Sequence, residues 1–172
     1  SGSTSYGIEL ATNVSNNTFF RNIISSVSRG VSIDGATKTT TSNPEETRWN
    51  YFTNDTIVPC TSGCEDNYFD ISVVNNATDI ILLNVSFNKS RISMMSGNGA
   101  DRVEKNNLTV KWYLKINVTN ATNNKAIAGA RVVVNDSFAF NVFNASTDAT
   151  GGITTEVTEF TINGTYNSSI LF

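Results

Sequence analysis

The sequence contains no histidine, few charged residues and no long apolar run, and each shortage excludes a class of function. Without histidine there is no Ser-His-Asp or Cys-His catalytic machinery. Charged residues make up 16% of the chain and the net charge is −3, so no basic surface is available to attract nucleic acid or an anionic membrane. No run of about 18 apolar residues occurs, which argues against membrane insertion within this segment.

Only two cysteines are present, Cys60 and Cys64, and they close the short loop CTSGC. In an exported protein this spacing indicates a local disulfide. A zinc site would need two further ligands, and histidine is not available to supply them. We therefore expect a disulfide here, no metal and no cofactor.

Asparagine, serine and threonine are abundant, with 24 asparagines and 41 serines and threonines together. Random placement of these residues would give roughly 6 N-x-S/T triplets. The sequence has 13, headed by Asn13, Asn16, Asn54, Asn76, Asn84, Asn88, Asn107, Asn117, Asn120, Asn135, Asn144, Asn163 and Asn167. The excess predicts glycosylation acceptors on a heavily N-glycosylated, extracellular or cell-surface protein. The alternative is that Asn and Thr are simply common in β-turns and ladders.

An exported protein needs an export signal, and no charged, apolar and small-residue signal pattern opens this sequence. We expect the signal and any membrane anchor to lie outside this segment. Whether the segment is a fragment or a mature subunit is left open.

The longest apolar run, Ile80-Ile81-Leu82-Leu83, lies within residues 77–95. It is followed by alternation at Val85, Phe87, Ile92 and Met94. The run predicts a strand buried on both faces that leads into one with a single buried face. A helix is disfavoured because β-branched residues and repeated Asn and Ser fit a strand better.

Two short apolar segments, GIEL at residues 7–10 and GVSI at residues 30–33, repeat the same strand 23 residues apart. A repeat of this length with Asn- and Gly-rich turns is what a coil of a parallel β-solenoid requires. Together with NNTFFRNI at residues 16–23, GIEL resembles the right-handed parallel β-helix repeat family of archaeal surface proteins. The polar insertion 37–47 and the segments 50–52 and 67–69, only 17 residues apart, depart from that pattern. The resemblance therefore implies irregular coils over residues 1–105, with the disulfide loop 60–64 protruding.

A polar, Gly-containing stretch at residues 96–107 predicts a domain boundary, and clean alternation follows from Leu108 to Val118. Further short apolar segments contain Val132, Val134, Phe138, Phe140 and Val142, and then Ile153, Val157 and Phe160. Strands with turns every 8 to 12 residues suggest a β-sandwich.

Two motifs in this part, IAGARV at residues 127–132 and TDATGG at residues 147–152, resemble the carboxypeptidase-regulatory-like or adhesin-stalk Ig-like modules. The predicted fold is therefore all-β: irregular β-helix coils followed by a small Ig-like β-sandwich module at residues 106–172. This layout resembles archaeal cell-surface proteins, and the resemblance implies a structural or adhesive role.

Two features of the sequence are candidate ligand sites. Solenoid lyases and hydrolases need clustered carboxylates, but Glu65-Asp66 with Asp70 beside the disulfide loop is typical of a solvated surface, so we expect no catalytic residue and no enzyme. Exposed rings of Trp49, Tyr51 and Tyr68 could instead form a glycan platform. The alternative is that Phe52 and Phe69 stack in the core and the tyrosines cover edges.

The sequence thus favours a non-enzymatic surface, sheath or filament subunit or an adhesin segment, with a carbohydrate-binding module as the second hypothesis. A parallel coil leaves unpaired backbone groups on its end strands. The first predicted strand starts near residue 6 and the sequence ends on the apolar residues 170–172. We therefore expect open self-association or neighbouring domains of a longer chain.

Overall fold

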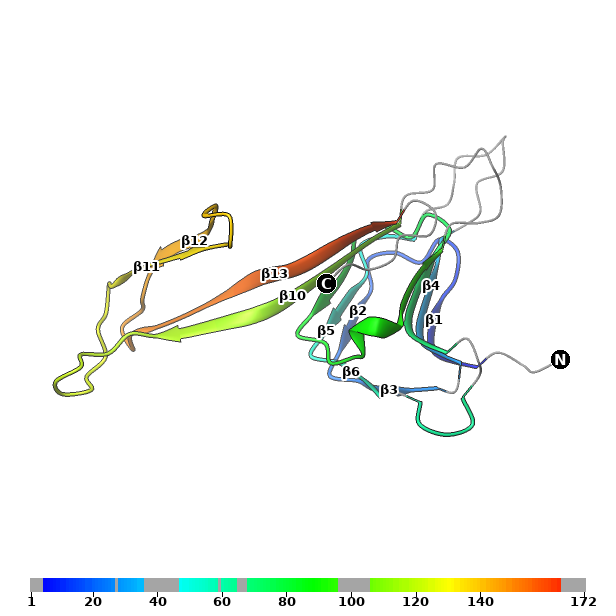
Figure 1. Ribbon diagram of the computed structural model, residues 1–172, viewed down its shortest axis with the longest axis horizontal. Helices are drawn as coiled ribbons and strands as arrows, with labels where there is room; N and C mark the ends of the chain where they lie inside the picture. Colours follow the sequence, from blue (N-terminus) through cyan, green and yellow to red (C-terminus); the bar gives the residue numbers. More distant parts are fainter. Residues whose placement is uncertain are drawn as a thin grey trace. The chain divides into compact units, whose positions relative to one another are not determined.

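The computed structural model describes residues 5–26, 28–35, 47–58, 60–64, 68–95 and 106–164. In these ranges every regular element is a β-strand except one three-residue 3₁₀ turn, so the fold is all-β as the sequence predicts (Figure 1). The elements are β1 (Tyr6–Leu10), β2 (Thr18–Phe20), β3 (Ile23–Ser25), β4 (Arg29–Asp34), β5 (Tyr51–Thr53), β6 (Thr56–Val58), β7 (Phe69–Val74), β8 (Ile80–Leu83), η1 (Lys89–Arg91), β9 (Ile92–Met95), β10 (Asn106–Asn117), β11 (Arg131–Asn135), β12 (Asn141–Ser146) and β13 (Gly152–Gly164). No helix in these ranges has the length and apolarity that crossing a bilayer demands.

The chain divides into two compact units: unit 1 contains Ser1–Lys111 and Glu159–Phe172, and unit 2 contains Trp112–Thr158. The boundary therefore falls inside β10 and β13, whereas the sequence predicts it between residues 105 and 106. The difference has a plain cause, because Leu108–Lys111 of β10 pair with β8 and belong to the sheet of unit 1.

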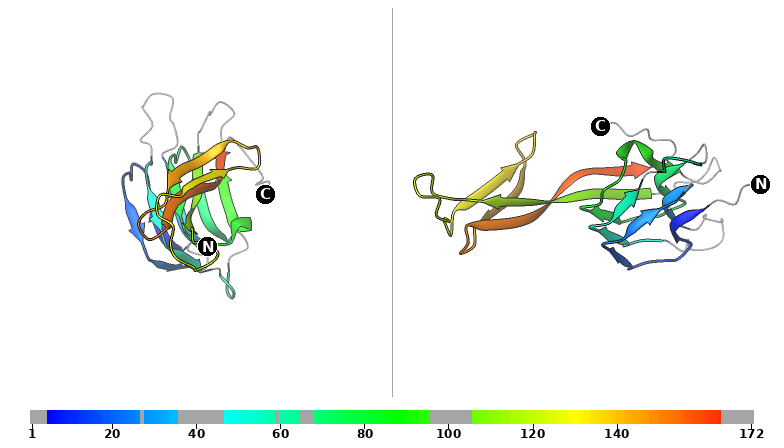
Figure 2. Two further views of the ribbon diagram at one scale, coloured as in Figure 1. Left: turned by 90° about the vertical axis from the view of Figure 1, so that its left-hand side faces the viewer. Right: turned by 90° about the horizontal axis from the view of Figure 1, so that it is seen from below.

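Unit 1 is built from strands in three sheets, and apart from β13 these strands pair in parallel. Sheet A has the strand order β1-β4-β7-β9, sheet C pairs β3 with β6, and sheet B has the order β13-β10-β8-β5-β2. The chain visits these sheets in turn, from β1 to β2 to β3 and then from β4 to β5 to β6, so each passage lays a new strand beside the previous one (Figures 1 and 2). The two predicted strand copies lie side by side, with Ile8 opposite Val31 and Leu10 opposite Ile33.

The apolar residues of these strands form the core of unit 1. Phe52 is fully buried and its ring stacks on that of Phe19, with 4.6 Å between the ring centroids. The other large side chains without measurable exposure, or nearly so, are Ile33, Ile57, Ile71, Ile80, Leu82, Leu108, Val31, Val73, Val85 and Val110. Burial of a side chain of this size contributes about 1.5–3 kcal/mol relative to exposure.

Residues 77–95 do not form one continuous sheet. β8 is largely buried, as the apolar run predicts, but η1 turns the chain so that β9 joins sheet A rather than sheet B. The side chain of Asn88 caps η1 by accepting a hydrogen bond from the Ser90 amide. The change in the pattern from a run to alternation therefore marks a change of sheet.

Buried polar side chains join successive passages of unit 1. Asn50 is fully buried; its Oδ1 accepts from the Asn17 amide at 3.2 Å, and its Nδ2 donates to the Val14 carbonyl at 2.8 Å. Asp55, 1% exposed, accepts through Oδ1 from the Asn22 amide at 2.6 Å and the Asn22 side chain at 2.9 Å. These contacts satisfy backbone groups that the turns between strands would otherwise leave without partners.

Unit 2 contains residues 112–117 of β10, residues 152–158 of β13, and sheet D, which is the antiparallel hairpin β11-β12. Along all four strands, half-buried residues alternate with exposed ones. Figures 1 and 2 show sheet D over one side of the β10-β13 ladder. The motif at residues 147–152 forms a turn: Asp148 accepts from the Thr150 hydroxyl at 2.6 Å and from the Gly152 amide at 3.0 Å. These hydrogen bonds, with that of the Thr150 amide, lower the pKa of Asp148.

The apolar segment that contains Phe138, Phe140 and Val142 is only partly a strand. Phe138 and Phe140 lie in the loop between β11 and β12, and β12 begins at Asn141. The hydrogen-bonding capacity of Asp136 explains the loop, because its carboxylate binds the amides of both phenylalanines at 2.9 Å.

Some predictions fall on residues outside the described ranges. They concern the polar insertion 37–47 apart from Thr47, most of the expected boundary at 96–107, Glu65 and Asp66, Asn167, and the two ends of the sequence.

Candidate functional site

The asparagines of the N-x-S/T triplets are distributed unevenly between surface and interior. Eight are exposed: Asn13, Asn16, Asn88, Asn117, Asn120, Asn135, Asn144 and Asn163. Asn54, Asn84 and Asn107 are half-buried, and Asn76 is buried with 7% exposure. The exposed set contains the asparagines whose amide nitrogens a glycan-transferring enzyme could reach in the folded protein.

Backbone conformation explains five of these asparagines without glycosylation. Asn13, Asn16, Asn54, Asn76 and Asn84 have positive φ angles between 54° and 64°. Asparagine tolerates this left-handed region better than most residues do, so a turn alone accounts for its presence there. The left-handed backbone is therefore consistent with the alternative interpretation for these five, whereas it gives no reason for asparagine at Asn88, Asn107, Asn117, Asn120, Asn135, Asn144 and Asn163.

Two exposed triplets already form local Asx turns. The Asn88 side-chain oxygen accepts from the Ser90 amide at 3.0 Å and the Ser90 hydroxyl at 2.7 Å. The Asn120 oxygen accepts from the Thr122 amide at 2.8 Å. In both cases the acceptor asparagine is joined to the third residue of its own triplet, and its amide nitrogen points away from that contact because the oxygen makes it.

Two other triplets use their amide nitrogens within the fold. Asn84 Nδ2 donates to Asn54 Oδ1 at 2.7 Å, which links equivalent turns of two neighbouring strands in sheet B. Asn107 Nδ2 donates to Asn163 Oδ1 across β10 and β13. Glycosylation of either donor would have to rearrange an existing contact.

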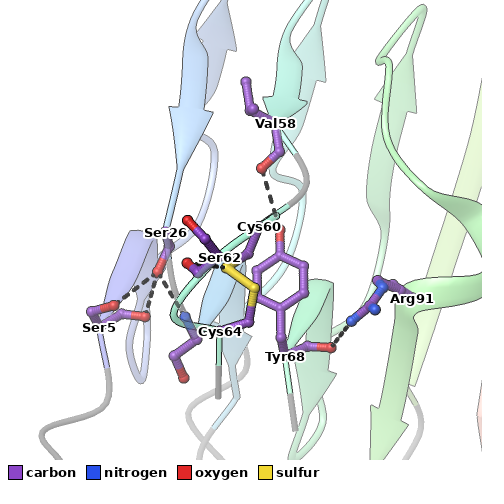
Figure 3. The surroundings of a disulfide bond; sticks show 9 residues. Ser5, Ser26, Val58, Cys60, Ser62, Cys64, Tyr68 and Arg91 are labelled. Carbon is purple, nitrogen blue, oxygen red and sulfur yellow. Dashed lines mark hydrogen bonds between the residues drawn. A yellow bond between two sulfur atoms is a disulfide. The ribbon is translucent and has the colours of Figure 1, made fainter. Parts of the chain in front are cut away.

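Cys60 and Cys64 form the predicted disulfide, with 5.9 Å between their Cα atoms. The loop is exposed, and its base is held by Tyr68, whose hydroxyl donates to the Val58 carbonyl at 3.3 Å (Figure 3). The Arg91 guanidinium lies 5.2 Å from the centre of the Tyr68 ring and donates to the Tyr68 carbonyl. Burial, followed by the nearby Asp70 carboxylate, raises the pKa of the Tyr68 hydroxyl.

The aromatic side chains considered as a glycan platform do not stay together. Trp49 and Tyr51 are 44% and 41% exposed, but Tyr68 is 3% exposed and supports the disulfide loop instead. Phe20 on β2 is a further exposed ring, 52% exposed, and lies opposite Thr53 of the neighbouring strand β5. Arg48 stacks over Trp49 at 4.4 Å and Arg21 over Phe20 at 4.7 Å. Trp49 also has a φ of 55°, which a bulky residue rarely adopts.

Of the acidic cluster, the described residues include only Asp70. No group of three or more metal-ligating side chains occurs within the described ranges, and Glu65 and Asp66 lie outside them. Asp70, the third member, is completely buried and accepts from the Asn88 amide at 2.6 Å. It helps to hold the chain that leads into η1.

Sequence patterns alone missed the exposed pair Phe138 and Phe140, which are 80% and 71% exposed at the end of the β11-β12 hairpin. Phe138, Phe140 and Val142 alternate with polar or small residues as they would in a strand, so the sequence pattern does not distinguish the loop from a strand. The available signal is Asp136, because an Asp side chain can accept from the backbone amide two residues on and so favours a turn over a continuing strand.

Comparison of the chain with protein-family models, with curated proteins and with solved structures finds no match.

Proposed function

We propose that this chain is a non-enzymatic, N-glycosylated extracellular protein with a structural role at the cell surface, as a sheath, envelope or filament subunit or as part of an adhesin. The observation that carries the proposal is the twofold excess of N-x-S/T triplets, of which eight place their asparagine on the surface. Seven of the described triplets have no left-handed backbone that would require asparagine. The disulfide agrees with an oxidising compartment.

The architecture fits this role. We infer that unit 1 is a short parallel β-helix, because three sheets of parallel strands are visited in turn with matched registers. We infer likewise that unit 2 is a minimal Ig-like sandwich with two strands in each layer, because the β11-β12 hairpin faces the β10-β13 ladder. Modules of these two kinds can serve as rigid spacers. The resemblance of the sequence to archaeal surface proteins supports a structural role rather than a catalytic one.

Glycopeptide mapping of the protein from its native host tests the proposal. We expect an intact mass several glycans above 18.6 kDa. Asn88 and Asn120 should be occupied, because both are exposed and each already forms an Asx turn with the third residue of its triplet. Buried Asn76 should be unmodified and serves as the internal control. A native mass equal to that of the bare chain would remove the basis for the proposal.

A second candidate function is carbohydrate binding at the exposed rings. Trp49 favours it, because a bulky residue held in the left-handed region with its ring open to solvent is a costly arrangement that a ligand would justify. Tyr51 lies two residues away, and the guanidinium over Trp49 adds a donor for sugar hydroxyls or carboxylates.

A glycan array with enzymatically deglycosylated protein separates the two functions. If the rings bind sugar, Trp49→Ala is expected to lower the signal at least about tenfold, the loss typical of an aromatic anchor. The control is Phe138→Ala, which removes an exposed ring from unit 2 and should leave sugar binding unchanged. Equal array signals for the Trp49→Ala variant and the unaltered chain would exclude the rings as a sugar site.

A further inference from the structure

The triplet headed by Asn16 lies directly beside the exposed aromatic residues at the start of β5. Its third residue, Thr18, pairs with Tyr51 in the parallel register of β2 and β5. The same register continues ahead of the two strands, because the Asn16 amide donates to the Arg48 carbonyl at 3.2 Å. In a parallel ladder this bond places Asn16 next to Trp49. The glycan acceptor and the indole are therefore neighbours, and both are exposed.

Trp49 occupies a turn position that its neighbours fill with residues suited to a left-handed backbone. Asn16, Trp49 and Asp79 have φ angles of 61°, 55° and 55°. Asp79 lies on the other side of Trp49, because the preceding residues Arg48 and Thr78 form a parallel bridge. Asparagine and aspartate tolerate this conformation, whereas a bulky residue is strained in it. The turn accounts for Asn16 and Asp79 but gives no reason for a tryptophan between them.

The indole of Trp49 keeps an open apolar surface at this position. The Arg48 guanidinium lies 4.4 Å from the ring centre, on one face of the ring. Trp49 nevertheless remains 44% exposed, and Tyr51 beside Thr18 is 41% exposed. An exposed indole combines a large rigid apolar area with one polar N–H group, which suits contact with the C–H face and hydroxyls of a sugar ring.

We propose that the glycan attached to Asn16 folds back over Trp49, so that its first sugar ring packs against the indole. The inference rests on the N-glycosylation proposed above, and it assigns a partner to the exposed ring. Glycan transfer forms a bond between Asn16 Nδ2 and the anomeric carbon of an activated glycan donor. The leaving group of the donor departs with the bonding electrons, and the nitrogen loses one proton.

The position of the triplet favours the attached glycan over a free sugar as the occupant. Neighbouring strands are about 4.8 Å apart, so the first sugar on Asn16 emerges one strand spacing from Trp49. A covalent link of this length gives an effective concentration in the millimolar range, which makes even a weak sugar contact persist. A free sugar would need further contacts to be retained at the same ring.

Acrylamide quenching of Trp49 fluorescence tests the proposal on the glycosylated full chain. The chain has two tryptophans, so the substitution Trp112→Phe leaves Trp49 as the only emitter. In this background Asn16→Asp should raise the quenching constant at least about twofold, because removal of the glycan uncovers the indole. Aspartate tolerates the left-handed backbone of this position but accepts no glycan.

Asn13→Asp is the matched control. Asn13 is exposed, heads its own triplet and has a φ of 64°, so the substitution removes a glycan acceptor and adds the same charge three residues earlier. It should leave the quenching constant unchanged. Circular dichroism establishes that each variant is folded. The unaltered chain produced in a host that attaches no N-glycans gives the same comparison without a substitution, and its quenching should match that of Asn16→Asp.

A double-mutant cycle measures the contact through stability. With Trp49 present, loss of the Asn16 glycan should raise the unfolding equilibrium constant by about twofold to tenfold, the range of one aromatic contact. In the Trp49→Ala background the same loss should have no effect within a factor of about two, because the ring that the sugar contacts is absent. Equal effects in the two backgrounds would mean that the glycan acts without the indole.

Glycopeptide mapping separates the failure of this inference from the failure of the proposed function. An unmodified Asn16 on a chain that is glycosylated elsewhere would overturn the packing and leave the proposed function intact. Equal quenching for Asn16→Asp and Asn13→Asp on chains with the expected glycans would do the same. A chain that carries no glycan at any triplet would overturn both.

Discussion

Replacement of Asp55 by alanine is expected to lower the free energy of unfolding by about 3–5 kcal/mol, because three donors would lose one buried, charged acceptor at once. Asp55 Oδ1 accepts from the backbone and the side chain of Asn22, and Oδ2 accepts from the Thr53 amide at 3.0 Å. The residue is 1% exposed, so water has little access to replace the lost contacts. A shift of the chemical-denaturation midpoint, followed by circular dichroism, measures the loss.

Two further variants show whether hydrogen bonding is the cause. Asp55→Asn keeps one acceptor oxygen but turns an amide group towards a donor, so it should lose roughly half as much stability as alanine. Glu9→Ala removes an exposed carboxylate from β1 and should change stability by no more than about 0.5 kcal/mol. A loss below about 1 kcal/mol for Asp55→Ala would mean that the turn relaxes and satisfies its donors otherwise.

The parallel strands of unit 1 could be predicted because their apolar spacing is local. Residues 7–10 and 30–33 carry the same pattern, and in the structure they pair in register. The pattern places β-branched and apolar residues where a strand must bury them, and it needs no knowledge of distant contacts. The apolar run at Ile80–Leu83 was recognised for the same reason.

The longer repeat was missed because turn asparagines and core asparagines look alike in sequence. The segments NTFFRNII at residues 17–24 and NYFTNDTI at residues 50–57 lie 33 residues apart and share Asn, Phe and Ile at their first, third and last positions. In the structure Phe19 lies opposite Phe52, and both Asn17 and Asn22 bind partners 33 residues later. The identical segments NYF at residues 50–52 and 67–69 suggest a repeat of 17 residues instead. That repeat is misleading, because β5 and β7 belong to different sheets.

The disulfide and the exposure of most triplet asparagines could be anticipated, whereas the separation of the aromatic side chains could not. Trp49, Tyr51 and Tyr68 are close in sequence, but Tyr68 begins the next passage through sheet A and is buried beneath Arg91. Sequence proximity does not establish a common surface when a loop changes the sheet between two residues. The exposure of Phe138 and Phe140 could not be predicted either. The turn that the Asp136 carboxylate fixes has the same alternating sequence pattern as a strand.

Phe52→Ala is expected to cost about 3–5 kcal/mol of stability, the range for truncating a fully buried phenylalanine. Phe52 has no solvent exposure, and its ring stacks on Phe19 at an interplanar angle of 12°. Truncation would leave a cavity between the strands of unit 1 and remove an aromatic contact worth about 0.5–1.5 kcal/mol beyond its buried area.

Phe20→Ala is the matched control for this variant, since the same side chain is removed from β2, the strand beside β5, where it is 52% exposed. Its expected cost is below about 1 kcal/mol, because its ring contacts solvent and the Arg21 guanidinium rather than the core. Denaturation midpoints of the two variants give the comparison. Equal losses would contradict the assignment of Phe52 to the core and Phe20 to the surface, and would remove Phe20 from the exposed rings available to a sugar.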